Sequence, residues 1–366
     1  MMFTRLQLLT SSRNFLAKGL TVAIRYGLVR TQFKNYKDPT TGKIVERKLL
    51  DYQTHLNRIC PLLAINFAIV FGAQFMMTSY DQMMNLVQQK EDFSMLAPMH
   101  TILSGFKALW CNLCYEGVKT LRECCGGVGF HAYSNFPSML DALSSKVTLE
   151  GDSVVMYLQT ARSLLKGGRK VVSSGKSLNK MIEYIGDLKI LMEQKDNFKC
   201  LAKSMDDFRD EKFLLDLLKW NALIRIGKCL QLFADSKYKD FSLWEKFNEK
   251  FQLDLIKMAQ AHSYYMTALY FLNGIDHAEK EGTCKNLIKH MRVLFKIFCL
   301  HSVTTQGAAL ALSQYLSPEQ FRMAHELLQE QYKVIRPQML NLIESFEYDD
   351  SIMSSAIGNY DGNVYE

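Results

Sequence analysis

Proline is scarce in this 366-residue chain, and a regular strand pattern is missing altogether. Between the prolines the chain is rich in Leu, Met, Ala, Lys and Glu, which favour helices. No run alternates between apolar and polar residues as a half-buried strand does. These two absences predict an all-α protein without a β-sheet, built as two consecutive antiparallel helical bundles. The six prolines are Pro39, Pro61, Pro98, Pro137, Pro318 and Pro337.

Long blocks of one charge sign are also missing. The net charge of +7 is modest and spread along the chain. No basic, aromatic-interleaved block of the kind that binds nucleic acid is present, so we expect no nucleic-acid partner. The positive charge can still attract an anionic ligand such as a nucleotide phosphate. Hydrophobic residues make up 48% of the chain and charged residues 22%, which indicates a globular rather than a disordered protein.

The cysteines form no disulfide framework. There are nine of them, an odd number without framework spacing, and no secretory signal is visible. We therefore expect reduced thiols in an intracellular compartment. Cys111 and Cys114 form a CxxC pair, but they lie inside a helical pattern and lack a second pair, so the sequence predicts no metal site.

The N-terminal stretch allows two interpretations. Residues 1–37 contain seven basic residues and no Asp or Glu, a composition typical of an organellar transit peptide. The alternative is a folded helix, because apolar residues recur at steps of three, four and seven, as at Leu9, Leu16 and Leu20. The length and regularity of this pattern favour a helix that packs in the fold.

Residues Ile59–Tyr80 form an uncharged run of twenty-two residues, long enough to span a bilayer. However, Pro61, Asn66 and Gln74 interrupt the run, and the chain offers no second span. We expect a buried helix at the centre of a bundle and no transmembrane segment.

Small residues suggest where one helical unit ends and the next begins. Gly167–Gly168 and Ser173–Gly175 form a break between two helical patterns. We therefore expect one unit over residues 1–170 and a second over residues 178–366, with the split near residues 165–178.

Signals for turns, loops and helix starts subdivide these two units. Pro39–Gly42 predicts a turn, and Gly126–Gly129 predicts a glycine-rich loop. Ser317 and Pro318 are typical of the N-cap and the first position of a helix. Within the second unit, the periodicity predicts long helices over Lys180–Lys203, Asp210–Asp235, Trp244–Leu272 and Cys284–Tyr315.

One stretch combines a carboxylate, a glycine and a helix start. In Thr148–Arg162, Asp152 and Ser153 are N-cap candidates for an apolar helical run. Gly151 allows the backbone to turn sharply before it. Glu150 would then lie beside a tight loop at a helix N-terminus. Taken alone, this arrangement is more typical of a solvated loop carboxylate than of a catalytic group.

Five short motifs occur in order along the chain. They are Arg25–Phe33, Leu50–Ala64, Arg122–Phe130, the stretch around Glu150 up to Arg162, and Tyr360–Glu366. Each motif alone is weak. Together and in this order they resemble the acyl-CoA oxidase family of flavoproteins, which is related to the acyl-CoA dehydrogenases.

The resemblance covers the two C-terminal helical domains of that family. Family members begin with a helical domain and a β domain, and no part of this chain resembles them. We expect a fragment, a truncated gene model or a variant repurposed without chemistry. Two functions follow from the resemblance. One is FAD-dependent oxidation of acyl-CoA by O2 to trans-2-enoyl-CoA and H2O2, the first step of fatty-acid β-oxidation. The other is a non-catalytic helical scaffold, or dimerisation remnant, of the same family.

The resemblance also implies roles for two residues near the substrate. Glu150 matches the catalytic base, which removes a proton from the carbon next to the thioester carbonyl. Arg5 lies twenty-five residues before Arg30, the spacing at which related dehydrogenases place a substrate-contacting arginine. Leu149 departs from the family's usual aromatic residue before the base.

A second group of residues matches the family's contacts with FAD. A guanidinium suits a pyrophosphate because it is always charged and binds two oxygens at once. Glycines suit a loop whose backbone approaches the nucleotide. Without the resemblance, Arg30 is a helix-end cation and the glycine loop a helix stop. The cofactor-binding candidates are Arg30, Gln32, Phe33, Gln53, Gly126 and Gly127.

Partners and location are implied in the same way. In the family, several flavin contacts reach the partner subunit's flavin, so a homodimer is implied, with a fatty acyl-CoA and O2 as substrates. The resemblance implies a peroxisomal location, although the chain ends without a basic peroxisomal tripeptide. A mitochondrial location is the alternative.

Overall fold

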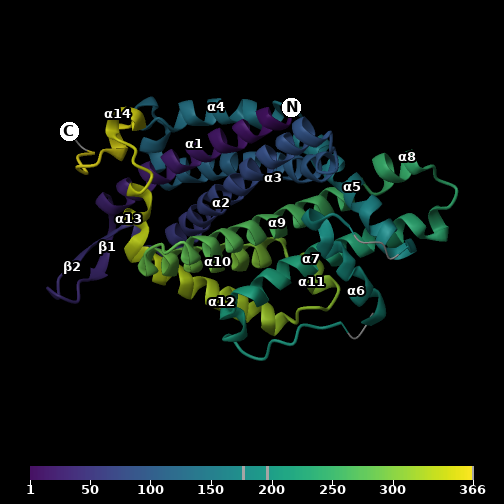
Figure 1. Cartoon of the computed structure of the whole chain (residues 1–366). Coiled ribbons are helices and arrows are strands. Elements are labelled where there is room, and N and C mark those ends of the chain that lie inside the picture. Colours follow the sequence, from purple (N-terminus) through teal and green to yellow (C-terminus); the bar gives the residue numbers. More distant parts are fainter. Residues whose placement is uncertain (175–177, 195–197, 365–366) are drawn as a thin grey trace.

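The computed structural model describes residues 1–174, 178–194 and 198–364, and long helices dominate it (Figure 1). The prediction of an all-α fold is confirmed. The helices are α1 Met2–Val29, α2 Gln53–Lys90, α3 Leu96–Cys124, α4 Phe136–Thr148, α5 Ser153–Ser174, α6 Leu188–Gln194, α7 Glu211–Ala234, α8 Leu243–Glu245, α9 Gln252–Lys280, α10 Lys285–Gln306, α11 Ala308–Leu312, α12 Pro318–Ile335, α13 Met339–Glu344 and α14 Asp350–Met353. The strands are β1 Thr31–Lys37 and β2 Ile44–Lys48.

Helix α1 is a core element. It packs against α2, α3 and α4, and Leu9, Leu16 and Leu20 are completely buried. The apolar spacing in the sequence therefore marks a helix that packs in the fold, as predicted. Burial of such a face stabilises the fold by about 2 kcal/mol for each large aliphatic side chain.

Helix α2 contains the long uncharged run. Among the described residues it is the one helix long and apolar enough to cross a membrane, and 67% of its apolar window is buried inside the protein. The helix continues through Pro61. Asn66 is buried within it, where its amide oxygen accepts a hydrogen bond from Arg13 Nε at 3.1 Å and its Nδ2 donates to the Arg13 carbonyl at 3.2 Å. The predicted buried position of this segment agrees with the structure.

One continuous core joins the N-terminal and C-terminal helices. Helix α9 contacts α2, α3 and α5 on one side and α7 and α10 on the other, and α10 also packs on α2. In Figure 1, α9 and α10 lie between the α1–α4 layer and α12. The chain then returns through α13 to α1 (Figure 1).

A β-hairpin interrupts the helices, so the prediction that there is no β-sheet is wrong. β1 pairs antiparallel with β2 around the predicted turn, where Asp38 Oδ1 accepts from the backbone of Thr40 and Thr41. Most side chains of β2 are exposed. A ribbon exposed on both faces needs no alternation of apolar and polar residues, so no strand pattern is visible in the sequence there.

Two predicted helices are shorter than expected. Residues 180–187 form a 3-10 helix that leads into α6, and α6 ends at Gln194. Of the rest of the predicted span, residues 195–197 lie outside the described residues, and residues 198–203 have no helical structure. Helix α10 ends at Gln306, and Gly307 separates it from α11. Ser317 caps α12 as predicted, because its side chain accepts from the Gln320 backbone at 3.2 Å.

The small residues near position 167 do not end a helix, contrary to the prediction. Helix α5 continues through Gly167 and Gly168 to Ser174. A Cβ at Gly168 would lie 2.8 Å from Leu230 Cδ1 of α7, so the glycine allows α5 and α7 to pack closely. Residues 175–177 of the predicted boundary lie outside the described residues. The division into two units stays a prediction.

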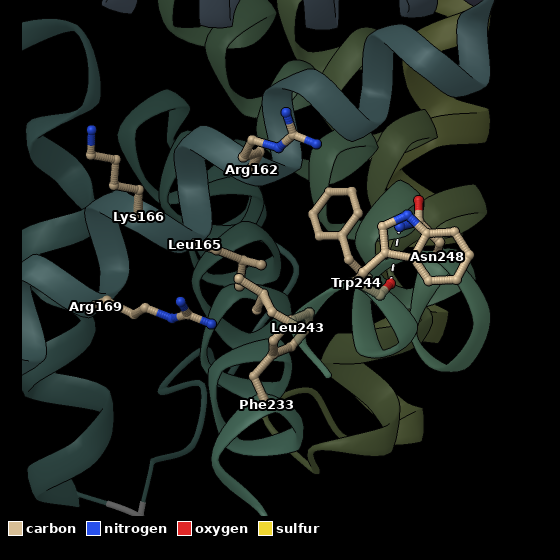
Figure 2. A pocket seen from close by; sticks show the side chains of 9 residues that line it. Arg162, Leu165, Lys166, Arg169, Phe233, Leu243, Trp244 and Asn248 are labelled. Carbon is tan, nitrogen blue, oxygen red and sulfur yellow. Dashed lines mark hydrogen bonds between the residues drawn. The ribbon is translucent and has the colours of Figure 1, made fainter. Parts of the chain in front are cut away.

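The segment between α7 and α9 projects from the bundle as an arm containing α8 (Figure 1). Leu243 and Trp244 on this arm are exposed. Together with Phe233 and part of α5, the arm encloses a cavity of about 550 Å³ (Figure 2). In Figure 2, Lys166 of α5 points away from these apolar side chains, whereas the guanidinium of Arg162 lies over the Phe247 ring, 5.3 Å from its centroid.

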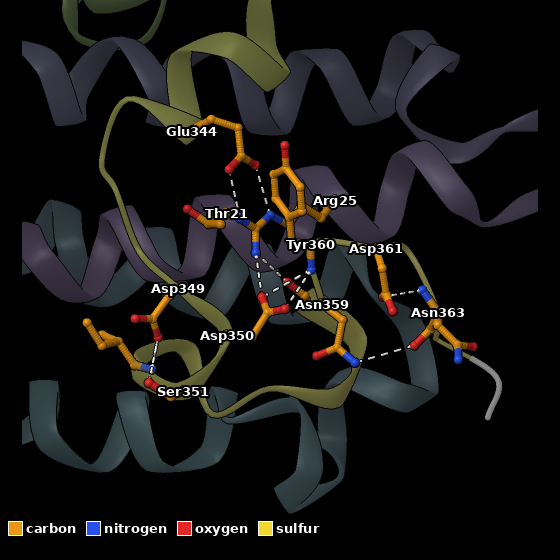
Figure 3. A network of polar contacts seen from close by, with 12 residues as sticks. Thr21, Arg25, Glu344, Asp349, Asp350, Ser351, Asn359, Tyr360, Asp361 and Asn363 are labelled. Atoms are coloured by element: carbon orange, nitrogen blue, oxygen red, sulfur yellow. Dashed lines mark hydrogen bonds and ion pairs between the residues drawn. The ribbon is translucent and has the colours of Figure 1, made fainter.

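The C-terminal segment is held to α1 by a buried arginine (Figure 3). Arg25 donates to both carboxylate oxygens of Glu344, at 2.9 and 2.8 Å, and to Asp350 at 3.1 Å. Its Nη1 also donates to the Gly358 carbonyl at 2.8 Å, and the Tyr360 ring lies 5.3 Å from the guanidinium. Burial opposes the charge, but the hydrogen bonds and carboxylates raise the pKa of Arg25 above its ordinary value. This network orders the motif at residues 360–364.

A buried histidine makes the fold sensitive to acid. His262 of α9 is fully buried, its Nδ1 lies 2.7 Å from the Tyr184 hydroxyl, and its Nε2 has no hydrogen-bond partner among the described residues. Burial lowers the pKa of His262 to about 3. Below about pH 6.5 a histidine in the unfolded chain binds a proton, whereas the buried His262 of the folded chain stays neutral. Stability is therefore lost as the pH falls from about 6.5 towards 3.

We predict that His262→Gln reduces this acid sensitivity. At pH 5 the buried histidine costs the wild-type chain about 2 kcal/mol relative to neutral pH, and the variant avoids that cost. Urea unfolding at pH 7.5 and pH 5 measures the difference. His325→Gln, at an exposed histidine, is the matched control and should keep the wild-type pH dependence. Equal pH dependence in His262→Gln and the wild type would contradict the prediction.

Candidate active site

Glu150 lies in the short loop between α4 and α5. Its φ is +59°, and the φ of Gly151 is +117°. A Cβ at Gly151 would lie 2.6 Å from Met156 Cε, so both the dihedral angle and the available space require glycine there. Asp152 caps α5, as predicted, because its Oδ1 accepts from the Val154 backbone at 2.8 Å. The backbone therefore turns sharply at Glu150 and Gly151 between the two helices.

Buried cations hold the backbone of this loop. Lys107 of α3 is fully buried, and its ammonium donates to the carbonyl of Val147 at 2.7 Å and to the carbonyl of Gly151 at 2.5 Å. Arg5 of α1 donates to the Glu150 carbonyl from Nη2 at 3.2 Å and from Nε at 3.3 Å. The carbonyls of Val147, Glu150 and Gly151 thus all accept charge-assisted hydrogen bonds.

Neutral side chains of α3 complete this support. The Asn112 amide donates to Ser153 Oγ at 2.9 Å. Arg5 Nη1 lies 3.3 Å from His100 Nδ1, which accepts, and 3.4 Å from Ser104 Oγ. Burial and the neighbouring Arg5 lower the pKa of His100, which favours this neutral, accepting form. Helices α1 and α3 therefore fix the loop together.

The electrostatics of the loop follow from burial. Burial lowers the pKa of Lys107, and Cys111 and Asp152 oppose part of that shift. Burial also lowers the pKa of Arg5, while the charge of Glu150 opposes the change. Among the described residues, no side chain or backbone group donates a hydrogen bond to the half-buried Glu150 carboxylate. The backbone of Glu150 is fixed, and its carboxylate remains available to an external group.

Arg5, predicted to contact substrate, lies against this loop. It is only 4% exposed, and its donors are directed at Glu150, His100 and Ser104. Its side chain therefore acts on the loop backbone in this structure. A contact with substrate stays a prediction.

Three of the cofactor-binding candidates lie at the far end of α1. Arg30 directly follows the last residue of the helix, and its carbonyl accepts from the Leu49 backbone at 2.9 Å. Gln32 and Phe33 belong to β1, and the register shifts between Gln32 and Lys34. Phe33 is therefore the bulged residue. Its φ is +60°, its side chain is 60% exposed, and its ring meets Tyr52 edge-on at 6.0 Å.

The remaining candidates lie at the ends of α2 and α3. Gln53, the first residue of α2, is exposed and donates to Gln329 of α12 at 3.2 Å. The ring of His55 lies 3.2 Å from the Cys124 carbonyl, which brings the start of α2 to the end of α3. There the exposed Gly126, with a φ of +64°, and Gly127 have open space where a Cβ would lie.

The structure thus separates the predicted residues into two groups. Arg5 and Glu150 lie together at the start of α1, and Arg30 lies at its end. With a rise of 1.5 Å per residue, the twenty-five residues between Arg5 and Arg30 span about 37 Å. The two groups do not form one site within a single chain.

Sequence reasoning missed the residues that support Glu150. Lys107 lies in an apolar helical pattern, where a lone lysine is normally read as solvated, and Asn112 and His100 belong to no motif. The one available sign was that apolar residues of α3 flank Lys107 on both sides, because a lysine in such surroundings is often buried and paired. No group of three or more His, Cys, Asp or Glu side chains that could hold a metal occurs within residues 1–174, 178–194 and 198–364.

Comparisons with known proteins agree with the motif pattern. The family model for the acyl-CoA oxidase C-alpha1 domain matches residues 1–165, and the acyl-CoA oxidase model matches residues 210–366. Peroxisomal acyl-coenzyme A oxidase 2 of Rattus norvegicus is 29% identical over the whole chain, which covers 52% of that protein. Rat peroxisomal acyl-coenzyme A oxidase 1 is 28% identical, with 53% of it covered. The chain spans about half the length of these relatives.

Solved structures give the same result. Acyl-CoA oxidase 1 of Arabidopsis thaliana superposes on the whole chain with a TM-score of 0.90 and 26% identity, and 52% of that chain is covered. Acyl-CoA oxidase-1 of Caenorhabditis elegans, solved in complex with FAD and ATP, gives a TM-score of 0.88 over the whole chain. At 22% identity, with 52% of it covered, that likeness concerns the fold alone. Together, the two family models and the shared fold show that this chain belongs to the acyl-CoA oxidase family.

Proposed function

We propose that these 366 residues supply the catalytic base and part of the flavin site of an FAD-dependent acyl-CoA oxidase. The reaction converts acyl-CoA and O2 to trans-2-enoyl-CoA and H2O2. The observation that carries the proposal is the loop at Glu150. Its backbone is held by two buried cations, while its carboxylate accepts no hydrogen bond from the described residues.

Glu150 would take the proton from the carbon next to the thioester carbonyl. A base must stay within hydrogen-bond reach of its proton through the reaction. Lys107 and Arg5 fix the carbonyls around it, so the carboxylate can rotate about its own side-chain bonds while its Cα stays in place. Such support is what holds a reacting group in near-attack geometry.

The residues at the far end of α1 fit an FAD. Open space over Gly126 and Gly127 admits a nucleotide close to the backbone, and Arg30 offers a guanidinium beside it. The exposed Phe33 presents a flat ring, and Gln32 and Gln53 present amides from the same end of the bundle. When bound, FAD supplies the hydride acceptor that no side chain provides.

Because the base and the flavin candidates lie about 37 Å apart along α1, each chain contributes to two different sites. We propose a homodimer in which the Arg30 end of one protomer completes the partner's flavin site. We also propose that the protein acts in the peroxisome, where the named relatives are placed.

We predict that Glu150→Gln abolishes peroxide release while flavin stays bound. The assay needs an assembly in which the part of the oxidase not spanned by these residues is supplied in cis or in trans. Glutamine keeps the shape of the side chain and removes the basic oxygen. Asp152→Asn, which alters the neighbouring carboxylate and keeps the helix cap, should remain active within a few fold. The 366 residues alone should release little or no peroxide with acyl-CoA.

Two outcomes would contradict this account. Full activity of Glu150→Gln would show that another group is the base, and strong peroxide release from the 366 residues alone would show that the site needs nothing further. If the wild-type assembly binds FAD and acyl-CoA but turns over no substrate, the scaffold alternative holds.

We predict that Lys107→Met loosens the Glu150 loop. Without the ammonium, the carbonyls of Val147 and Gly151 lose their partner, at a cost of about 1–3 kcal/mol for a buried acceptor. Hydrogen exchange of residues 147–153 should accelerate, and the free energy of unfolding should fall. Lys119→Met, at an exposed lysine of the same helix, is the control and should change stability by about 0.5 kcal/mol or less. Unchanged exchange in Lys107→Met would refute the support role.

We predict that Arg30→Ala weakens FAD retention in the same assembly. Loss of one charged phosphate contact costs about 1.5–3 kcal/mol, which corresponds to roughly a tenfold to hundredfold weaker affinity. Flavin absorbance after dialysis measures it. Lys37→Ala, on the same hairpin, should retain the flavin. Equal flavin content in Arg30→Ala and the wild type would mean that Arg30 is only a helix-end charge.

A further inference from the structure

A large cavity lies on the far side of α7 from the features described so far. Its volume is about 1020 Å³, at the upper end of the range of about 300–1,000 Å³ for ligand sites. Helices α5, α6, α7, α9 and α11 and the end of α10 contribute to its lining. Val172, its lining residue on α5, lies nineteen residues along the helix from Ser153, about 28 Å from the Glu150 loop. The α6–α7 side of the cavity is therefore remote from the proposed active site, while Gln260, at its α9 side, contacts Tyr157 in the first turns of α5.

Its walls combine aliphatic side chains with charged, amide and hydroxyl side chains. Apolar side chains of α6 pack on α7, where a Cβ at Gly227 would lie 3.3 Å from Leu191 Cδ2, and they line the cavity beside that contact. Leu312 of α11, another lining residue, is 86% exposed. Such exposure of a leucine beside an apolar cavity is what an entrance for an apolar ligand presents. The aliphatic lining residues are Val172, Leu188, Leu191, Ile224, Leu230 and Leu312.

One half-buried cation in the lining has no ion-pair partner among the described residues. Arg225 of α7 donates from Nη2 to the Gln306 carbonyl at 3.2 Å. Asp254, the one acid in the lining, forms its ion pair with Lys228 at 2.9 Å. Burial lowers the pKa of Arg225, and the neighbouring Cys229 and Asp254 oppose part of that shift.

The lining is also positive overall. Arg225, Lys228 and Lys257 outnumber Asp254, so the cavity carries an excess of two positive charges. A half-buried guanidinium is stabilised when an anion completes its hydrogen bonds, and a carboxylate matches its planar geometry. The smaller cavity under the arm differs, because its guanidinium groups, those of Arg162 and Arg169, lie over the rings of Phe247 and Phe233.

From this combination, we propose that the cavity between α6, α7 and α11 binds a single-chain aliphatic carboxylate, with its head at Arg225 and its chain along the α6–α7 walls. The aliphatic part of the lining suits an alkyl chain, and the guanidinium of Arg225, which has no ion pair among the described residues, suits one carboxylate. The site is independent of Glu150 and of the flavin candidates, so it does not rest on the proposed reaction.

Calorimetric titration of the 366-residue chain with dodecanoate tests the proposal. Dodecanoate should bind at one site per chain, and tetradecanoate should bind about tenfold more tightly, because two more methylenes leave water. Dodecanol, which has the same chain without the charge, should bind about 10-fold to 100-fold more weakly. Arg225→Gln should reduce dodecanoate affinity by the same factor and leave dodecanol unaffected.

Two further variants separate binding from folding. Leu312→Asp changes an exposed residue, so it should keep the wild-type thermal unfolding temperature and weaken dodecanoate by repulsion and by loss of apolar contact. Arg169→Gln, which removes a cation from the other cavity, should bind as the wild type does. Equal affinity of dodecanoate in the wild type and in folded Arg225→Gln or Leu312→Asp would overturn the proposal. Equal binding of dodecanol and dodecanoate would overturn it too, as would tight binding of dodecyl phosphate without binding of dodecanoate.

Discussion

Helix α1 is buried along most of its length, so the basic side chains on its buried faces must find partners inside the protein. An unpaired charge in the interior is costly, and a charge that accepts or donates strong hydrogen bonds is tolerated. Arg5 meets the Glu150 carbonyl, Arg13 meets Asn66 of α2, and Arg25 meets Glu344 and Asp350. Each contact joins α1 to a different part of the chain. Helix α1 therefore fixes the Glu150 loop, helix α2 and the C-terminal segment relative to one another.

The same length that lets α1 organise the fold also separates its two ends. A straight helix of 28 residues holds its termini about 42 Å apart. The loop with Glu150 and the hairpin with Phe33 are fixed to opposite ends, and no rotation of side chains brings them together. A single chain can hold the parts of the proposed reaction only in two separate places. The proposed reaction would then depend on surfaces supplied by other parts of the assembly.

The elements that were predictable from the sequence are those whose pattern reflects burial on one or more faces. Helices α1 and α2 carry apolar residues at helical spacing, and Ser317 and Pro318 carry the chemistry of a helix start. The β-hairpin carries no such pattern, because both of its faces are largely exposed. Gly168 was misread because a glycine that admits a neighbouring helix looks, in sequence, like one that ends a helix.

The candidate site shows the same division. Glu150 and the glycine loop were accessible through short motifs, since their neighbours in sequence are also their neighbours in space. Lys107 was not, because its partners are main-chain carbonyls forty and forty-four residues away. A backbone carbonyl leaves no trace in the amino-acid sequence. Supports of this kind become visible only when the fold brings the helix and the loop together.

Backbone strain distinguishes Phe33 from the other non-glycine residues with positive φ. In the described part of the chain, Glu91, Asn135, Glu150, Gln314, Glu347 and Ser354 also have positive φ, and each lies beside a helix end, where such a conformation satisfies terminal carbonyls or starts the next helix. Phe33 has no helix to terminate. It adopts its conformation, at a cost of about 1 kcal/mol or more, in a bulge that points a bulky aromatic ring outward. A bulge re-aims a side chain, and here it leaves the ring of Phe33 60% exposed, with an edge-on contact to Tyr52. A strained, exposed aromatic ring at this position supports the proposal that the hairpin contacts the flavin of the assembly.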